Sequence, residues 1–477
     1  MKKFLGYTFV ITILLLSIKV DYRLVSDIYC CKDDHDYYAH AETIAEDFDF
    51  DYTNHYMKFR GPDATNSIDV NGYTVAHNIL SITGEFTMQP FVDYDNEIVC
   101  VYNGQIYNYD DFGEFGSDGE CIIPTYKKFG ERAFVTLDGE FAIVLADFKN
   151  NLLHLVTDPF ATKPLWYGIE NGKIGVASYE SAVKSLGFRN VVKQDANKIL
   201  TFNLETKELV NEMTTYEFVL HQFSESFDGW IAAFKESIRK RTRGIREKVF
   251  IGLSSGYDSG GIACELNEQN IPYKAYAVVG HENQDILNER FSMFNMNSTG
   301  EYLQDNRWAH KDYINKNVEE FKYRIYSSSS DYNEFNTRLQ DDNGSCGLSM
   351  ICDTARKEGH KIYLSGSGSD EIFSDYGFGG EKKFAHSNFG GLFPEDLSTI
   401  FPWASFYGST MVSYLAKEEY VAGSYGIETR YPYLDKYVVQ EFLSLTHTLK
   451  NSKYKSVLDE YLTRSNYPFE KNIKRGF

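Results

Sequence analysis

The sequence predicts an α+β half, built as a sandwich of antiparallel sheets, followed by an α/β half built on a parallel sheet. Three observations predict this. Short β-rich runs separated by turn residues fill positions 55–205, which is typical of stacked antiparallel sheets. From position 225 short apolar runs alternate with helical patterns, which is typical of parallel strands joined by helical crossovers. Finally, 477 residues exceed what one hydrophobic core usually supports.

The change of pattern falls between 205 and 225, so we expect domains over 1–215 and 216–477. Lys149-Asn150-Asn151 lies between two apolar runs and predicts a hairpin turn. The strands expected in the first half lie within 98–109, 141–158 and 197–210. In the second half we expect helices at 227–243, 261–269 and 351–360, and strands at 249–253, 273–280 and 361–366.

Charge and cysteine content exclude several classes of protein. The formal net charge of −20 argues against nucleic acid as a partner, because phosphate backbones are bound by basic surfaces. The seven cysteines have neither the number nor the spacing of a disulfide framework or a zinc site. We expect reduced thiols and a cytoplasmic protein.

The N-terminal residues allow two interpretations. Lys2 and Lys3 precede a mostly apolar run, Phe4–Ile18, which resembles the charged and apolar regions of a signal peptide or anchor. The same run, rich in β-branched and aromatic residues, also fits a buried first strand. Both interpretations of residues 1–20 stay open, and we expect no membrane partner for the rest of the chain.

Two Ser/Gly-rich loops follow predicted strands of the second half. Ligands of open parallel sheets bind beyond the carboxyl ends of the strands, and free N–H groups at a helix N-terminus favour anions. The loops lack the Walker A pattern, but acids at their ends suit a hard cation such as Mg²⁺. The first loop contains Leu253, Ser254, Ser255, Gly256, Asp258 and Ser259, and the second contains Ser365, Gly366, Asp370 and Glu371. The pair therefore predicts a site for Mg²⁺ and a nucleotide.

The first loop resembles the S-G-G-x-D-S pyrophosphate loop of the ATP pyrophosphatases. LSGSGSDEIF at 364–373 resembles the L-S-G-E-G-x-D-E-L-F segment of the asparagine synthetases. Further segments similar to that family occur in its order: RGPD at 60–63, MQP at 88–90, YNGQIYNY at 102–109, LDGEFAIVLAD at 137–147, DPFATKPLWYG at 158–168, ASYES at 177–181, GIETRYPYLD at 426–435 and KRGF at 474–477.

This resemblance implies a class II glutamine amidotransferase-like domain of the Ntn-hydrolase type, followed by an ATP-pyrophosphatase synthetase domain. In that family Mg-ATP adenylates a carboxylate, ammonia attacks, and AMP and pyrophosphate leave. By resemblance the two loops bind ATP, Val278 lies by the adenine, Asp258 and Asp370 hold Mg²⁺, and Lys455 offsets charge at the phosphates. Asp258, Asp370, Glu371 and Lys455 are the expected catalytic residues.

The first half departs from the family at its glutamine site. Residue 2 is Lys where the family has its nucleophilic Cys, and only processing would bring Cys30 or Cys31 to an N-terminus. Ile79 stands in place of the Arg that clamps the glutamine carboxylate, and Gln105 in place of a Glu. The matching residues that remain are Asn103, Gly104 and Asp118. We therefore expect impaired glutamine hydrolysis, with the domain serving as a scaffold as in the β-lactam synthetases.

The second half departs at three positions. Ser255 replaces a Gly, Ser367 replaces a Glu that assists adenylation in the family, and Asp459 replaces an Arg. Three readings stay open: an amide-forming synthetase, a non-catalytic ATP-binding or scaffold homologue, and a β-lactam-synthetase-like enzyme acting on another carboxylate. The expected partners are a small carboxylate such as aspartate, with ammonia or glutamine, and a homodimer stays open.

Overall fold

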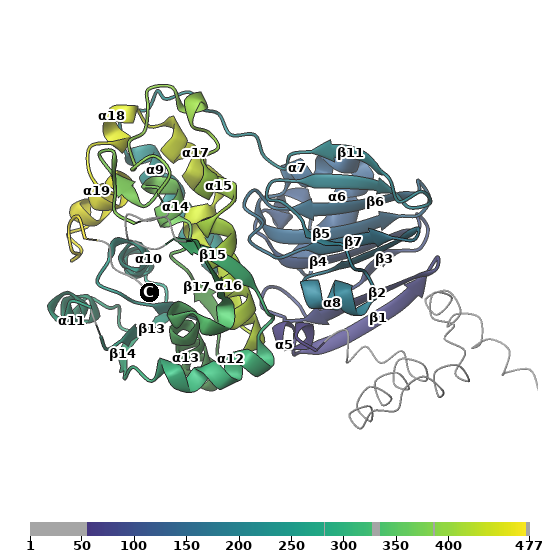
Figure 1. Cartoon of the computed structure of the whole chain (residues 1–477), viewed down its shortest axis with the longest axis horizontal. Helices are drawn as coiled ribbons and strands as arrows, with labels where there is room; N and C mark the ends of the chain where they lie inside the picture. The colour runs from purple at the N-terminus through teal and green to yellow at the C-terminus, as the bar shows by residue number, and fades with distance from the viewer. Residues whose placement is uncertain (1–54, 281, 327–333, 385–386, 474–477) are drawn as a thin grey trace, which may run out of the picture.

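The computed structural model describes residues 55–280, 282–326, 334–384 and 387–473. Three features of the sequence lie outside these ranges: the Phe4–Ile18 run, the Cys30–Cys31 pair and the closing KRGF segment. The described residues form two bodies, one of stacked sheets and one of helices around a sheet (Figure 1). The predicted fold class of both halves is confirmed.

A six-stranded antiparallel sheet in the order β11-β10-β6-β5-β4-β3 forms the centre of the first body. Its strands are β3 (Phe91–Asp93), β4 (Ile98–Ile106), β5 (Gly139–Asp147), β6 (Leu152–Thr157), β10 (Ile199–Asn203) and β11 (Leu209–Met213). Two smaller antiparallel sheets accompany it: β1 (Ala64–Val70) with β2 (Tyr73–Ile79), and β7 (Trp166–Glu170) between β8 (Lys173–Ala177) and β9 (Val191–Lys193). The helices are α5 (Met57–Arg60), α6 (Ile122–Phe129), α7 (Ala133–Thr136) and α8 (Glu180–Ser185), with 3₁₀ turns η1 (Tyr109–Phe112), η2 (Asp118–Cys121) and η3 (Gly130–Arg132).

The turn between β5 and β6 forms where the sequence predicts it. Asn151 has φ 60°, a left-handed conformation that asparagine tolerates better than most residues. The carboxylate of Asp147 accepts hydrogen bonds from the backbone N–H of Asn150 at 3.0 Å and from its side-chain amide at 2.8 Å. These local bonds stabilise the turn and set the register of the hairpin.

The second body has a five-stranded parallel sheet in the order β14-β13-β12-β17-β20. Its strands are β12 (Lys248–Gly252), β13 (Tyr273–Val278), β14 (Thr299–Leu303), β17 (His360–Leu364) and β20 (Glu428–Arg430); two hairpins, β15 (Lys322–Tyr326) with β16 (Glu334–Arg338) and β18 (Gly377–Phe378) with β19 (Glu381–Lys382), lie outside the sheet. The helices are α9 (Asp228–Thr242), α10 (Tyr257–Glu268), α11 (Gln284–Ser292), α12 (Lys311–Asn317), α13 (Asn343–Lys357), α14 (Ser369–Phe373), α15 (Ala404–Tyr407), α16 (Thr410–Ser424), α17 (Lys436–Ser444), α18 (His447–Lys450) and α19 (Ser456–Arg464), with 3₁₀ turns η4 (Arg307–His310), η5 (Leu339–Asp341), η6 (Leu397–Thr399) and η7 (Pro432–Leu434).

Alternate residues of β12 point to opposite faces of this sheet, as strand geometry requires. Val249 and Ile251 belong to a core cluster that includes residues of α9, α10, α17 and α19. Phe250 belongs to a second cluster, with residues of α13 and α16. Helices thus cover both faces, which explains why the three consecutive residues Val249, Phe250 and Ile251 are all apolar. Because helices bury both faces of the sheet, a ligand can reach it at the polar loops that follow the strand ends.

Buried ion pairs join the two bodies. The carboxylate of Glu419 on α16 lies 2.6 Å from the Arg60 guanidinium and 2.7 Å from the Lys163 ammonium. The guanidinium of Arg241 on α9 lies 2.7 Å from the Glu140 carboxylate. Arg60, Lys163 and Glu140 lie in three of the family-like segments of the first half, so these segments contribute to the contact between the bodies.

None of the helices in the described ranges is both long and apolar enough to cross a lipid bilayer. The described cysteines, at positions 100, 121, 264, 346 and 352, are all free and buried.

Candidate functional site

The two Ser/Gly loops meet at the carboxyl ends of β12 and β17, which are neighbours in the sheet. A Cβ atom added to Gly366 would lie 2.9 Å from the Cβ of Asp258, so only glycine permits this approach of the loops. The hydroxyl of Ser369 donates a hydrogen bond to Oδ1 of Asp258 at 2.6 Å. The structure therefore brings together the two loops that the sequence singles out.

Lys455 lies between the two acids of these loops. Its Nζ is 2.5 Å from Oδ1 of Asp258 and 2.7 Å from Oδ1 of Asp370, and its side chain is buried. Burial opposes the charge of the ammonium, but the two carboxylates outweigh it and raise the pKa of Lys455. The residue directly precedes α19 and has φ 47°, a left-handed conformation. The site thus contains one buried ammonium group between two carboxylates.

The first loop is shaped by its own hydroxyls. The N–H of Ser254 donates to the Ser259 hydroxyl at 2.9 Å, and the two serine hydroxyls are 2.9 Å apart. Gly256 precedes α10, so Asp258 occupies the first turn of that helix. Ser255 has no positive φ, so replacing the family's glycine introduces no backbone strain here.

Arg290 of α11 holds the loop from the opposite side. Its guanidinium is fully buried and donates hydrogen bonds to the carbonyl oxygens of Ser254 and Gly256, the latter at 2.8 Å, and to that of Pro468 at 2.8 Å. With its carbonyl groups turned toward Arg290, the loop keeps one defined backbone conformation.

Two acids that the sequence analysis missed contact Ser255. The carboxylate of Glu282 accepts hydrogen bonds of 2.6 Å from both the N–H and the hydroxyl of Ser255. Glu470 lies at the far side of the same hydroxyl, 3.4 Å away, and accepts a bond of 3.1 Å from the Asn283 amide. A carboxylate therefore occupies donors that the sequence analysis assigns to a phosphate. No motif marks either acid, so only the folded chain reveals them.

The other predicted residues of this half lie at the same edge of the sheet. Leu253 is buried, and its N–H donates to the Tyr276 carbonyl at 2.8 Å, while Val278 ends the neighbouring strand β13. Glu371 lies in the first turn of α14. Its carboxylate accepts bonds from the Gly368 N–H at 3.2 Å and from the Tyr376 hydroxyl. Glu371 thus stabilises the start of α14, which favours a structural role.

Asp459 is buried on α19, 2.9 Å from the ammonium of Lys453 and 3.2 Å from the hydroxyl of Tyr257. Both contacts are local to α19 and the start of α10. Asp459 therefore stabilises the contact of α19 with the start of α10, which follows the first loop, and adds no charge at the centre of the site.

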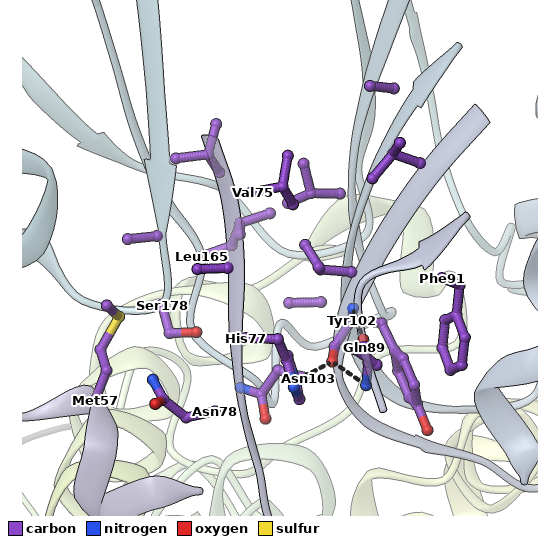
Figure 2. Close-up of a pocket in the computed structure, with 18 of the residues that line it drawn as sticks. Met57, Val75, His77, Asn78, Gln89, Phe91, Tyr102, Asn103, Leu165 and Ser178 are labelled. Atoms are coloured by element: carbon purple, nitrogen blue, oxygen red, sulfur yellow. Dashed lines mark hydrogen bonds between the residues drawn. The ribbon is translucent and has the colours of Figure 1, made fainter. Parts of the chain in front are cut away.

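A cavity of about 790 Å³ lies mainly in the first body, with Ile427 and Glu428 of the second body also in its wall, and none of its lining residues belongs to the two loops. Its wall includes every residue of β2 and β8, and apolar side chains of β4, β5 and β6. Figure 2 shows aliphatic side chains around its upper part and polar side chains at its lower end. The glutamine-site residues line it: Ile79, Asn103, Gly104, Gln105 and Asp118.

The polar end of the cavity is tied together by hydrogen bonds. The carbonyl of Tyr102 contacts Nε2 of His77 at 3.1 Å and Nε2 of Gln89 at 3.2 Å (Figure 2). Asp118 accepts bonds of 2.8 Å from the Ile106 N–H and the Tyr102 hydroxyl. Burial raises the pKa of Asp118 to about 6 and lowers that of His77 to about 4. The side-chain amide nitrogen of Asn103 is buried and has no hydrogen-bond partner among the described residues, so it is free to bind a ligand.

Two family models match the chain in succession. A glutamine amidotransferase domain matches residues 39–223, and asparagine synthase matches residues 230–401. These matches follow the order of the two bodies.

Three curated relatives illustrate the similarity. A putative glutamine-hydrolyzing asparagine synthetase of Methanocaldococcus jannaschii is 26% identical over 412 residues, 80% of this chain and 71% of that protein. The glutamine-hydrolyzing asparagine synthetase of Rattus norvegicus is 27% identical over 362 residues, 66% of this chain and 62% of the rat protein. The amidase chyE of Penicillium rubens is 33% identical over 162 residues, 32% of this chain and 24% of that protein.

The match thus spans less than two thirds of the rat and fungal proteins. With the two consecutive family matches and these relatives, the chain is a divergent member of the asparagine synthetase family.

Proposed function

We propose that the chain is an ATP-dependent synthetase that forms an amide. A carboxylate oxygen attacks the α-phosphorus of ATP and pyrophosphate leaves; ammonia or another amine then attacks the acyl carbon and AMP leaves. The observation that carries this proposal is the convergence of both Ser/Gly loops on Lys455, between Asp258 and Asp370. In this proposal the domain expected over 216–477 carries out the synthesis, and the domain expected over 1–215 supports it.

The residues at the loops fit a magnesium nucleotide. Carboxylate oxygens of Asp258 and Asp370 lie 2.5 Å and 2.7 Å from the same cation, the Lys455 ammonium. Two carboxylates that face one cation suit Mg²⁺, which is usually held by one or two carboxylates together with phosphate oxygens and water. Bound there, Mg²⁺ would offset the charge of the phosphates.

The chain's own groups complete the site. The N–H groups before α10 and the hydroxyls of Ser254, Ser259 and Ser365 would donate hydrogen bonds to the phosphates. Lys455 would move toward the pyrophosphate oxygens and stabilise the negative charge that develops as pyrophosphate leaves. Leu253 and Val278 would form the apolar wall beside the adenine.

The nitrogen source in this proposal is free ammonia rather than glutamine. Ile79 lies in the cavity wall where an arginine would pair with the glutamine carboxylate. Asn103 and Gly104 keep their positions there, whereas Gln105 replaces an acid. The first body then serves as a support for the second, through the ion pairs of Glu419 and Arg241.

A nucleotide-turnover assay tests the proposal. The full chain is incubated with ATP, Mg²⁺, ammonium and a panel of carboxylates that starts with aspartate and includes β-amino acids. AMP and pyrophosphate should form together in a carboxylate-dependent manner. No turnover with any carboxylate would contradict the enzyme proposal. Glutamate released from glutamine alone would contradict the proposal of an impaired glutaminase.

A second candidate function is ATP binding without turnover. The contact of Glu282 with the donors of Ser255 favours it, because this carboxylate must be displaced before a phosphate binds there. Calorimetry that detects Mg-ATP binding, together with no release of pyrophosphate, would support this candidate over the synthetase.

A further inference from the structure

Glu418 of α16 places a buried carboxyl group beside the second loop. The side chain is 8% exposed, and its Oε1 accepts a hydrogen bond of 3.0 Å from the hydroxyl of Ser367. Its Oε2 is buried and accepts no hydrogen bond from the described residues. A buried carboxyl oxygen without a partner costs free energy, so the position calls for a reason other than stability.

Titratable groups of α13, β17 and α16, together with Tyr431 after β20, lie around Glu418. Burial, together with the charge of Glu418, raises the pKa values of Cys352 on α13 and Tyr363 on β17. On α16 itself, Lys417 pairs with Asp342 at 3.7 Å, and Glu419 pairs with Arg60 and Lys163. Burial raises the pKa of Tyr431, which follows β20, and the charge of Glu418 adds to this rise. The cations nearest in sequence are thus engaged with other acids.

Burial raises the pKa of Glu418 to about 7. The hydroxyls of Ser365 and Ser367 and the charge of Lys417 oppose this rise, and Glu419 adds to it. A carboxyl group in this range can both take up and release a proton near neutral pH, which is what general acid–base catalysis needs.

Ser367 links this carboxyl group to the nucleotide loops. The hydroxyl of Ser367 is half-buried, and its N–H donates to the Ser365 hydroxyl at 3.0 Å. Gly368 follows Ser367 directly and precedes Ser369, whose hydroxyl donates a hydrogen bond to Asp258. Ser367 therefore lies on the loop that lines the proposed site, with Glu418 directly behind it.

We propose that Glu418 takes up, through Ser367, the proton that the amine releases when the amide forms. This inference rests on the proposed synthetase function. As the C–N bond forms and the C–O bond to AMP breaks, AMP leaves with the electron pair of that bond. The amine proton passes to Oγ of Ser367, and the hydroxyl proton of Ser367 passes to Oε1 of Glu418. Glu418 acts through Ser367 and is therefore a positioning and proton-holding residue.

The pH profile of turnover tests this inference. For the full chain with its best carboxylate and ammonium, kcat should rise with pH through a limb near 7, where Glu418 ionises. Glu418→Gln, which keeps the size of the side chain, should remove this limb and lower kcat by about 10²-fold or more, with KM for ATP unchanged. Ser367→Ala should lower kcat in the same way, and Glu418→Asp should restore part of it.

Glu319 provides a matched control. It is also a buried glutamate bonded by a serine: the Ser181 hydroxyl donates to it at 2.5 Å, and burial raises its pKa. Glu319 belongs to neither loop, so Glu319→Gln should leave the pH profile unchanged.

The outcomes separate the two proposals. Wild-type turnover with an unchanged profile in both Glu418→Gln and Ser367→Ala overturns this inference and leaves the synthetase function standing. Absence of wild-type turnover with every carboxylate overturns the function and the inference together. The infrared band of protonated carboxyl groups should contain a component that titrates near pH 7 in the wild type and is missing in Glu418→Gln, which supports the inference independently of turnover. The same component in both proteins overturns the inference.

Discussion

The ammonium of Lys455 lies 2.5 Å from Oδ1 of Asp258, although 197 positions separate the two residues in the chain. The same ammonium contacts Asp370. Three segments of the sequence thus meet at one cation.

Replacing Lys455 by Met should lower the free energy of unfolding by about 3–5 kcal/mol, because the buried carboxylate of Asp370 and the half-buried carboxylate of Asp258 lose the cation between them. Mg²⁺ should restore part of this loss by binding the same oxygens. Chemical denaturation with and without Mg²⁺ measures both effects. Lys453→Met is the control, since Lys453 is half-exposed and pairs with Asp459. A loss in Lys455→Met that Mg²⁺ leaves unchanged would contradict a cation site at these acids.

Glu282→Gln should tighten the binding of Mg-ATP and of inorganic pyrophosphate. The carboxylate of Glu282 competes for the N–H and hydroxyl of Ser255, and a hydrogen bond to a charged group contributes about 1.5–3 kcal/mol. The dissociation constant from calorimetry should therefore fall about tenfold or more. Asp285→Asn, an exposed acid nearby on α11, should have little effect. Equal affinities in wild type and Glu282→Gln would show that phosphate binds elsewhere.

Glu419→Gln should destabilise the contact between the two bodies. It leaves the buried cations of Arg60 and Lys163 without their carboxylate, which costs about 3–5 kcal/mol. Urea denaturation should show this loss. Glu212→Gln breaks the exposed pair with Lys198 and should cost about 1 kcal/mol or less. Similar losses in the two variants would mean that the Glu419 pairs contribute no more than a surface contact.

Asp118 should make stability depend on pH. Burial raises its pKa to about 6, above the value of about 4 in an unfolded chain, so the folded protein binds this proton more tightly. Its contribution is present below pH 4 and is lost as pH rises through about 6, a change of about 3 kcal/mol. Asp118→Asn should gain stability relative to wild type over this range in urea denaturation. The free energy of unfolding of Asp95→Asn, a change at an exposed position, should depend on pH in the same way as that of the wild type.

The positions of β12 and β17 along the chain and the two loops that follow them could be predicted, because each leaves a local pattern. The run Val249–Ile251 is apolar on both faces and ends in small polar residues, which identifies a buried parallel strand and its ligand-binding end. Helix α13 begins at Asn343, earlier than the predicted 351, because the Asp342 carboxylate caps it with a bond of 2.8 Å from the Ser345 N–H.

The partners within the site could not be predicted in the same way. Glu418 lies on α16, which is buried on most sides, so its sequence shows no polar face that would mark a functional side. Glu282 and Glu470 reach Ser255 only because α11 and the segment after α19 pack beside the first loop. Glu371 follows the family pattern in sequence, yet its carboxylate bonds to Gly368 and Tyr376.

Arg290 holds the carbonyl oxygens of Ser254 and Gly256 before any ligand arrives. The conformational entropy of this loop is therefore lost when the chain folds, and little of it remains to be lost when an anion binds. A rigid receptor of this kind discriminates by shape, because it cannot adjust to an anion that is too large or too small. Selection among nucleotides would then depend on Arg290, a buried residue that contacts the loop rather than the ligand.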